Sequence, residues 1–161
     1  DGNLMITWQL KLFAELTTTQ LYQLLKLRVD VFVVEQKCPY PELDDKDHQK
    51  DVYHLLGYEG DKLVACTRLL PKGVSYPSVS IGRVAISADH RGGGIGHQLL
   101  EEALRACQSL WPNESIEIGA QEYLEAFYTQ HGFVKTSDIY LEDGIPHIDM
   151  ILENKHSAIG N

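Results

Sequence analysis

Residues 90–100 read HRGGGIGHQLL, so the six positions from Arg91 to Gly96 hold four glycines and one arginine just before a helical apolar pattern. Glycine adopts backbone angles that other residues rarely reach, and it lets a ligand approach main-chain N–H groups closely. A glycine turn that opens a helix offers unpaired N–H groups and the positive end of the helix dipole, both of which favour a phosphate. The stretch therefore predicts a phosphate-binding loop between a strand and a helix.

Two common phosphate-binding loops do not fit this stretch. A Walker loop requires GxxxxGK followed by Ser or Thr, but His97 occupies the place of its second glycine. A dinucleotide fingerprint, GxGxxG, begins at Gly92 and Gly94 but also ends on His97. The sequence thus argues against a nucleoside triphosphatase and a dinucleotide site. A glycine turn with a purely structural role remains an alternative.

The patterns on both sides of the loop predict a mixed sheet. Before the loop, two β-type runs within residues 52–70 are joined at Gly60-Asp61, and residues 78–87 form a third run, which predicts an antiparallel meander. Strands joined through a helix normally run parallel, so we expect a central parallel pair across the loop. After the loop, we expect a helix over 95–107, a strand over 115–120, a helix over 122–130 ended by Gly132, and closing strands over 134–142 and 146–152.

The N-terminal part adds a strand, a helix and a long loop. Residues 6–13 alternate apolar and polar side chains as a half-buried strand does, and residues 17–19 offer a cap for an amphipathic helix over 20–36. Residues 37–51 contain acids and prolines without hydrophobic periodicity, which predicts a loop of uncommon length. Such loops are often functional.

Length and composition fit one domain. The chain has 161 residues, of which 43% are hydrophobic and 23% charged, enough to bury a core without disulfides or a metal. We assign the domain to residues 5–153, interpret residues 1–4 as a tag remnant, and expect residues 154–161 to form a polar, frayed tail. No apolar run is long enough to span a membrane and no signal peptide follows Met5, so we expect a soluble protein.

Charge and cysteine usage narrow the classes of partner. The net charge of −9 argues against DNA or RNA, because phosphate backbones are bound through clustered Lys and Arg. Three widely spaced cysteines predict neither a disulfide framework nor a zinc site, and they favour a reducing cytoplasm. His48 stands among acids, but no second histidine has ligand spacing, so we predict no metal. We expect no nucleic-acid and no membrane partner.

Two segments together resemble a known family. Residues 91–96 are similar to the Gln/Arg-x-x-Gly-x-Gly/Ala pyrophosphate loop of the GNAT acyltransferase superfamily, and residues 125–133, EAFYTQHGF, resemble its second signature. Residues 27–47, LRVDVFVVEQKCPYPELDDKD, and 142–150, EDGIPHIDM, are similar to its ElaA-type branch of small bacterial proteins. The resemblance covers nearly the whole chain. It implies a mixed α/β (α+β) fold with a largely antiparallel twisted sheet, a central splayed parallel strand pair and helices on both faces.

The resemblance also implies that acetyl-CoA is the co-substrate, with its pyrophosphate on the glycine loop. N–H groups of the strand before the loop would hold pantetheine and polarise the acetyl carbonyl, as preorganised donors do for a developing oxyanion. Gln121 departs from the asparagine that many members carry there. The implied contacts with coenzyme A are Val84, Ala85, Ile86, Arg91, Gly92, Gly93, Gly94, Ile95, Gly96, His97, Gln121 and Tyr128.

Acyl transfer from a thioester to an amine needs an uncharged amine and a proton for the departing thiolate. The resemblance assigns the general acid to Tyr128, since a phenol with a pKa near 10 can donate to a thiolate as it forms. The alternative is an ordinary core or surface tyrosine. The strand over 78–87 contains no carboxylate, so the base comes from elsewhere or is water. The candidates are His147, Glu122 and Glu35; His147 is preferred because the ordinary pKa of histidine lies nearest neutrality, and a structural histidine beside a proline is its alternative.

The resemblance places the acceptor site on the first helical region and the loop after it. Acids there would favour a cationic small molecule or peptide with a primary amine. For Asp45 and Asp47 in the same loop we prefer a solvated charged loop. The candidates for contact with the acceptor are Arg28, Glu35, Gln36, Tyr40, Asp44 and His147, with Glu42 as a further acid of this region.

The sequence as a whole predicts an N-acetyltransferase that moves an acetyl group from acetyl-CoA to a primary amine by direct attack in a ternary complex. Two other classes stay open: a non-enzymatic acyl-CoA binding or sensing module, and a structural domain whose glycines only turn the chain. Tyr128 favours the enzyme over the sensor, since a sensor needs no proton donor. The sequence identifies neither the acceptor nor the oligomeric state, and a homodimer is one option.

Overall fold

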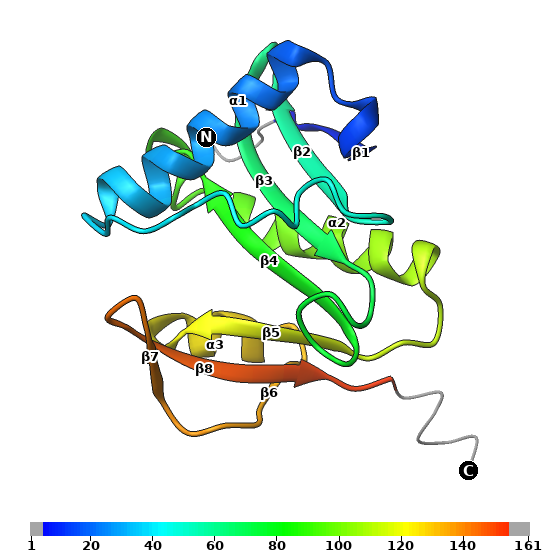
Figure 1. The fold of residues 1–161 in the computed structure, drawn as a ribbon, viewed down its shortest axis with the longest axis vertical. Helices are drawn as coiled ribbons and strands as arrows, with labels where there is room; N and C mark the ends of the chain where they lie inside the picture. Colours follow the sequence, from blue (N-terminus) through cyan, green and yellow to red (C-terminus); the bar gives the residue numbers. More distant parts are fainter. Residues whose placement is uncertain (1–4, 155–161) are drawn as a thin grey trace.

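The structure is a computed structural model that describes residues 5–154, and Figure 1 shows one twisted sheet with helices packed against it. Within these residues the eight strands follow the order β1-β2-β3-β4-β5-β8-β6, and β7 also pairs with β8. Every pairing is antiparallel except that between β4 and β5. The strands are β1 (Thr7–Leu12), β2 (Tyr53–Glu59), β3 (Lys62–Leu70), β4 (Val79–Ile86), β5 (Ile116–Gln121), β6 (Val134–Lys135), β7 (Tyr140–Glu142) and β8 (Ile145–Leu152).

Three α-helices cover the two faces of the sheet. The α1 helix (Thr18–Val29) starts at Thr17, whose hydroxyl accepts a hydrogen bond from the Gln20 N–H at 3.0 Å, and a π-helical segment (Asp30–Glu35) continues it. The α2 helix (Ile95–Leu110) follows the glycine loop, and α3 (Glu125–Thr129) follows a 3₁₀ turn (Glu122–Leu124). Further 3₁₀ turns are Phe13–Glu15 and Ala88–His90. None of these helices is long and apolar enough to cross a membrane.

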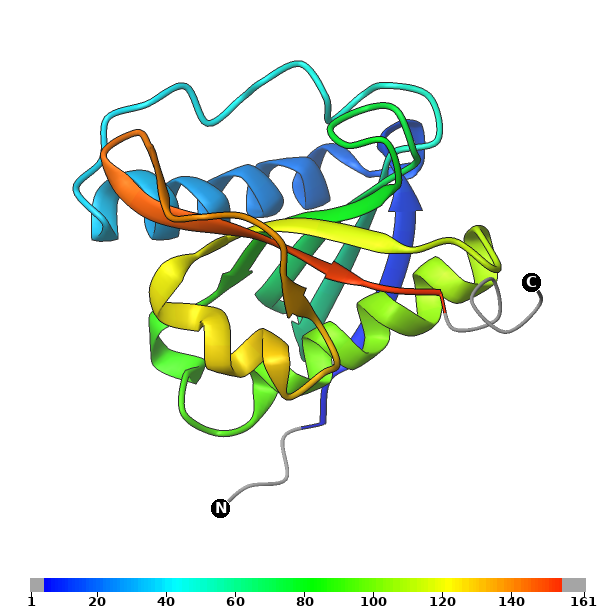
Figure 2. The ribbon, with the colours of Figure 1, turned by 90° about the horizontal axis from the view of Figure 1, so that it is seen from below.

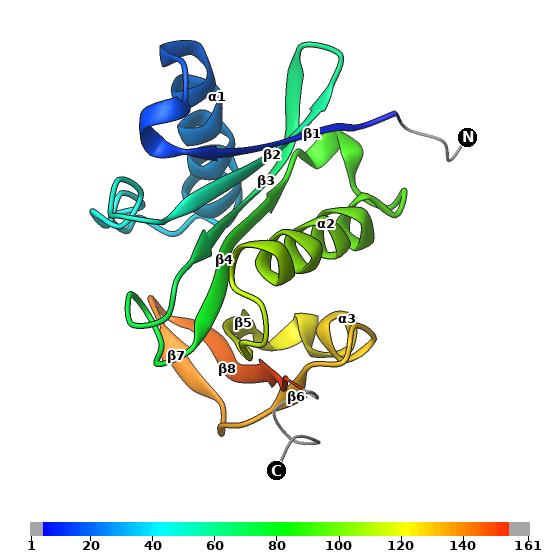
Figure 3. The ribbon, with the colours of Figure 1, turned by 90° about the vertical axis from the view of Figure 1, so that its right-hand side faces the viewer.

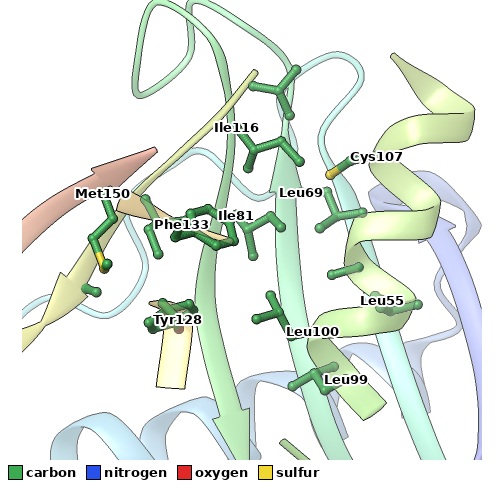
Figure 4. Close-up of a cluster of buried hydrophobic side chains, with 14 of the residues drawn as sticks. Leu55, Leu69, Ile81, Leu99, Leu100, Cys107, Ile116, Tyr128, Phe133 and Met150 are labelled. Carbon is green, nitrogen blue, oxygen red and sulfur yellow. The ribbon is translucent and has the colours of Figure 1, made fainter. Parts of the chain in front are cut away.

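The side-chain alternation of the central strands produces two apolar layers. Leu55 contributes to the core beneath α2 and α3, whereas the next residue, Leu56, packs in the core beneath α1. Figures 2 and 3 show α1 on one side of the sheet and α2 with α3 on the other. Figure 4 shows the larger core, which includes Ile81 of β4, Leu99 of α2 and Phe133. The predicted arrangement, helices on both faces of a largely antiparallel sheet, is confirmed.

The parallel strands β4 and β5 separate soon after they meet (Figure 1). Their pairing is confined to Val79 with Ile116 and Ser80 with Glu117, so within residues 5–154 the later part of β4 has no strand beside it on that edge. A bulge in β4 places both Arg83 and Val84 opposite a single β3 residue. Such a bulge bends the strand and redirects its side chains. The predicted splayed pair is therefore confirmed, and the gap that it opens lies just before the glycine loop.

The prediction of a single closing strand over 134–142 is wrong. It is divided into β6 and β7, which pair with different parts of the same edge of β8. The Asp149 N–H donates to the Ser137 hydroxyl at 2.8 Å, and the Thr136 N–H donates to the Asp149 carbonyl at 2.9 Å. These bonds replace a regular ladder at the middle of β8, because a side-chain oxygen takes the place of a backbone partner.

Candidate functional site

Two cavities meet where β4 and β5 separate. The glycine-loop cavity, of about 620 Å³, is lined by the loop, the first turn of α2 and the end of the π-helical segment. The acidic-loop cavity, of about 540 Å³, is lined by the 37–51 loop, β4, β5 and the turn between β7 and β8. The residues shared by both linings are Phe32, Gln36, Val84, Gln121, Leu124 and Tyr128. Two molecules bound in the two cavities would therefore meet beside Val84, Gln121 and Tyr128.

The glycine loop has the geometry predicted for an anion site. Gly92 and Gly94 both have a φ of +86°, a conformation that strongly favours glycine. Gly94 is the N-terminal cap of α2, yet no side chain caps this end and the first turn contains no acid. The first N–H groups of a helix lack intrahelical partners, so this end can accept an anion. Gly92, Gly94, Ile95, Gly96 and His97 line the glycine-loop cavity, whereas Gly93 does not.

An aromatic and histidine cluster fixes the first turn of α2 against α3. His97 Nδ1 lies 2.8 Å from His131 Nε2, and the His97 ring packs against Phe127 with centroids 4.8 Å apart. Burial and the neighbouring His97 lower the pKa of His131. A neutral His131 can share a single hydrogen between the two rings, which keeps the two helix ends together at neutral pH.

Arg91 and Glu35 form an ion pair across the glycine-loop cavity. The two Arg91 terminal nitrogens donate to the two Glu35 carboxylate oxygens, and Arg91 Nη2 also donates to the Ile86 carbonyl at 2.9 Å. The hydrogen bond from Arg91 lowers the pKa of Glu35. Glu35, predicted for the acceptor site or as a base, therefore lies on the glycine-loop side, because the π-helical segment carries it toward the loop.

Tyr128 lies at the junction of the two cavities. Its ring is packed between Phe127 and Phe133, with centroid distances of 5.1 and 5.8 Å. Within residues 5–154 its hydroxyl makes no hydrogen bond, although both cavities reach the side chain. Burial, with a smaller contribution from Tyr123, raises the pKa of Tyr128 to about 12. The phenol thus keeps its proton at neutral pH, and without a bound substrate it is a weaker acid than an ordinary tyrosine.

His147 lines the acidic-loop cavity. It is half-buried, and β-sheet pairing places it beside Gln121 at the end of β5. The contact of 2.7 Å between its Nδ1 and the Ile145 carbonyl requires Nδ1 to carry the hydrogen, since a carbonyl only accepts. In the neutral ring, Nε2 then has a free lone pair. The ring also stacks on Tyr140 with a centroid distance of 6.0 Å.

Three arginines and three carboxylates form a network beneath the acidic loop. Arg28 is buried, with Nε donating to Glu42 Oε2 at 2.6 Å and Nη1 donating to Asp47 Oδ1 at 2.7 Å. Arg28 therefore holds the loop from inside, and it lines neither cavity, unlike its predicted place in the acceptor site. The solvated position expected for Asp47 is wrong: burial would raise its pKa, but hydrogen bonds and charges from Arg28 and Arg68 outweigh burial and lower it.

Two arginines on the sheet complete this network and were missed in the sequence. Arg68 of β3 makes two hydrogen bonds of 2.8 Å with the carboxylate of Asp44, and Arg83 of β4 contacts Glu42 and Asp44. Burial would raise the pKa of Asp44, but the hydrogen bonds and charge of Arg68, with the charge of Arg83, hold it below its usual range. The signal available in the sequence was an arginine inside each of two otherwise apolar strand runs.

The other predicted residues divide between the cavities and the surface. Tyr40, Asp44 and Gln36 line the acidic-loop cavity, and the Tyr40 hydroxyl donates to the Glu42 carboxylate. Val84 and Ile86 line the glycine-loop cavity, whereas the Ala85 side chain packs beneath α1. Glu122 is exposed and lines neither cavity, and Asp45 is exposed. Among residues 5–154, no three His, Cys, Asp or Glu side chains are grouped so as to hold a metal ion.

Comparisons with known proteins agree with this geometry. Residues 23–154 match the family model described as Acetyltransferase (GNAT) domain. The ElaA protein of Escherichia coli (strain K12) is 45% identical over 149 residues, covering 92% of this chain and 97% of ElaA. The crystal structure of E. coli ElaA has a TM-score of 0.88 at 44% identity and covers 92% of this chain and 100% of that chain.

A second solved structure gives the same result. The crystal structure of an acyl-CoA N-acyltransferase from Pseudomonas aeruginosa has a TM-score of 0.87 at 46% identity, over 91% of this chain and 99% of that chain. The residues matched by the family model include the glycine loop, the splayed strands and Tyr128. The chain therefore belongs to the GNAT acetyltransferase superfamily and is a member of its ElaA-type branch.

Proposed function

We propose that this chain is an N-acetyltransferase that transfers the acetyl group of acetyl-CoA to a primary amine by direct attack in a ternary complex. An acyl-transfer role and an acyl-CoA co-substrate follow from the family. The acetyl group and the amine are the further steps of the proposal. The observation that carries direct transfer is that Tyr128 lines both cavities, because two substrates bound in them would meet beside a proton donor.

Acetyl-CoA fits the glycine-loop cavity in a defined direction. The pyrophosphate would lie on the N–H groups between Arg91 and Gly96, where the helix dipole favours negative charge. Pantetheine would extend along the unpaired edge of β4 near Val84 and Ile86, and the thioester would reach Tyr128. Arg91 would exchange its Glu35 partner for a phosphate when the cofactor binds.

We also propose that the protein works in the cytoplasm. All three cysteines are free, which fits a reducing compartment.

The chemistry proceeds by one addition and one elimination. The acceptor amine attacks the thioester carbonyl carbon, a C–N bond forms, and the C–S bond then breaks. N–H groups on the open edge of β4 would stabilise the oxyanion. Tyr128 would donate its proton to the leaving thiolate of coenzyme A. The proton lost by the amine would pass to His147 Nε2, directly or through water.

The direct test is coenzyme A release with a panel of primary amines, followed with a thiol-reactive dye. We expect release that depends on both acetyl-CoA and an amine, together with a product that is heavier by one acetyl group in mass spectrometry. A protein that binds coenzyme A by calorimetry but releases no thiol with any amine would be an acyl-CoA binding or sensing module instead. A folded protein that does not bind coenzyme A would be a structural domain.

His147→Ala should remove the ascending limb of the pH profile of kcat/KM. A primary alkyl ammonium is almost wholly charged at pH 7, so the reaction needs a group that accepts its proton. A general base acts only in its unprotonated form, so a reaction that depends on a base should become faster as pH rises. Rates measured from pH 5.5 to 9 with saturating acetyl-CoA would show this limb.

His48→Ala is the matched control for that experiment. His48 is exposed and lies outside both cavities, against Phe13, so its replacement should leave the pH profile unchanged. An ascending limb that persists in folded His147→Ala would exclude His147 as its source and leave water or another group as the proton acceptor. Lower stability with an unchanged profile would mean that His147 only packs and hydrogen-bonds in the closing strands.

A further inference from the structure

The side chain of Arg83 presents unused hydrogen-bond donors to the acidic-loop cavity. Its Nε donates to Glu42 Oε2 at 2.8 Å, and its Nη2 donates to the Glu42 carbonyl at 2.9 Å and to Asp44 Oδ2 at 3.3 Å. Its Nη1 has no partner among residues 5–154. An arginine carries five N–H donors, so the two on Nη1 remain free. Arg83 lines the cavity and its side chain is 19% exposed.

The position of Arg83 is imposed by the backbone. Arg83 lies in the β4 bulge with a φ of +51°, a conformation that costs energy for a residue other than glycine. Thr67 of β3 stabilises the bulge, since its hydroxyl donates to the Gly82 carbonyl at 2.8 Å. The bulge therefore holds the Arg83 guanidinium at the wall of the cavity. A strained conformation of this kind often occurs where a side chain must be aimed at a ligand.

Arg68 adds a second positive charge to the same cavity wall. It lines the same cavity and is only 4% exposed, and its Nη1 and Nη2 donate to the carboxylate of Asp44. Its buried Nε has no hydrogen-bond partner among the described residues. That Nε has almost no accessible surface, so a ligand in the cavity would feel the charge of the Arg68 guanidinium rather than accept a hydrogen bond from this N–H.

The charges around this wall leave room for an added anion. Glu42, Asp44 and Asp47 are balanced by Arg28, Arg68 and Arg83, so the network itself presents no excess negative charge. Two exposed acids of the cavity have no ion-pair partner among residues 5–154: Glu142 at the end of β7 and Asp143 in the turn before β8. The cavity thus has a guanidinium wall on β3 and β4 and a carboxylate rim on the β7–β8 turn.

We infer that the acceptor is a zwitterion, a primary amine that also carries a carboxylate, as in a free amino acid. The carboxylate binds the free Nη1 of Arg83 beside Arg68, and the ammonium group enters on the side of Glu142, Asp143 and His147. Charge-assisted hydrogen bonds from a guanidinium are among the strongest in proteins. This inference rests on the proposed function and names the substrate class of that site. It differs from the purely cationic acceptor that the acidic loop suggested from the sequence.

The test compares amino acids with the amines that lack only the carboxylate: phenylalanine with phenethylamine, tyrosine with tyramine, and lysine with cadaverine. We expect kcat/KM for the favoured amino acid to exceed that of its matched amine by at least tenfold. Arg83→Gln should reduce this ratio to about one, mainly by raising KM for the amino acid. Glu42 keeps its 2.6 Å contact with Arg28 in that variant, so the acidic loop should stay in place.

Lys46→Gln is the matched control, since Lys46 is another cation lining this cavity but its Nζ donates to the Ser75 hydroxyl at 2.7 Å. We expect this variant to keep the wild-type ratio. A general loss of structure would lower both rates together and leave the ratio unchanged, so the ratio reports on the carboxylate alone. The inference would be overturned if the wild-type protein had the same kcat/KM for the amino acid and for its matched amine. It would also be overturned if folded Arg83→Gln kept the wild-type ratio of these two values.

Binding gives a second readout that does not require turnover. Calorimetric titration of the same pairs into the protein with coenzyme A bound should show preference for the amino acid, and Arg83→Gln should remove it. Acetylation of amines without carboxylates would leave the proposed function standing and overturn this inference. Arg83-dependent amino-acid binding without thiol release would support this inference and overturn the proposed function. If neither the amino acids nor the matched amines bind, the inference of a zwitterionic acceptor is overturned.

Discussion

Tyr128→Phe is expected to lower kcat by about ten- to a thousandfold, the usual effect of removing one general acid. The affinity for acetyl-CoA should change little, because the ring and its contacts with Phe127 and Phe133 remain. Stability should also be nearly unchanged, since the hydroxyl makes no hydrogen bond within the described residues. The measurements are steady-state kinetics of thiol release, calorimetry with coenzyme A and a thermal melt.

The raised pKa of Tyr128 adds a pH criterion to this experiment. A general acid works while it is protonated, so its activity is lost when pH rises above its pKa. Burial raises that pKa to about 12, and any descending limb due to Tyr128 should therefore lie well above neutrality. A descending limb that wild type and Tyr128→Phe share near pH 8 to 9 would belong to another group.

Tyr123→Phe is the matched control for Tyr128. Tyr123 also lines the glycine-loop cavity, but it is 76% exposed and does not line the acidic-loop cavity. Loss of its hydroxyl should leave kcat unchanged. Full activity of Tyr128→Phe would mean that water or another group protonates the thiolate, and the general-acid assignment would fail while the cofactor site stood.

Local patterns in the sequence were sufficient to predict the glycine loop and the strand and helix next to it. A glycine cluster between a strand and a helix commonly forms a turn that opens the helix. A strand, a helix and a second strand in succession favour a parallel pair of strands. Tyr128 was proposed because it belongs to a short segment in which neighbouring residues also match a signature, and its catalytic role stays a prediction. Each of these features depends on residues close together in the chain, where the pattern itself carries the information.

The arginine network could not be predicted in the same way, because its partners are far apart in sequence. Arg68 meets Asp44 across 24 residues, and Arg91 meets Glu35 across 56 residues. Charge spacing gives no indication of such pairs, and an acid in a loop looks solvated until a buried guanidinium is found beneath it. This is why Asp47 was expected in solvent and Glu35 on the acceptor side. The division into β6 and β7 likewise depends on the distant contact between Ser137 and Asp149.

Gly94→Val is expected to weaken coenzyme A binding at least tenfold, or about 1.4 kcal/mol. Gly94 has a φ of +86° and lines the glycine-loop cavity at the start of α2. A β-branched residue is strained at that angle, and it either shifts the loop or places two methyl groups where the pyrophosphate would lie. Calorimetry with coenzyme A measures the affinity, and circular dichroism with a thermal melt checks the fold.

Gly93→Val separates the loss of the anion site from a general disturbance of the loop. Gly93 does not line the cavity, its φ lies outside the left-handed region, and a Cβ there would meet no atom within 4 Å. Its replacement should leave the affinity for coenzyme A nearly unchanged.

Gly73→Val is a control for backbone strain. Gly73 has a φ of +94° in the turn before β4, in a segment that does not line the glycine-loop cavity, so this variant measures the stability cost of strain alone. Unchanged affinity in folded Gly94→Val would remove the pyrophosphate from this loop, because no phosphate could approach its N–H groups past a valine side chain without loss.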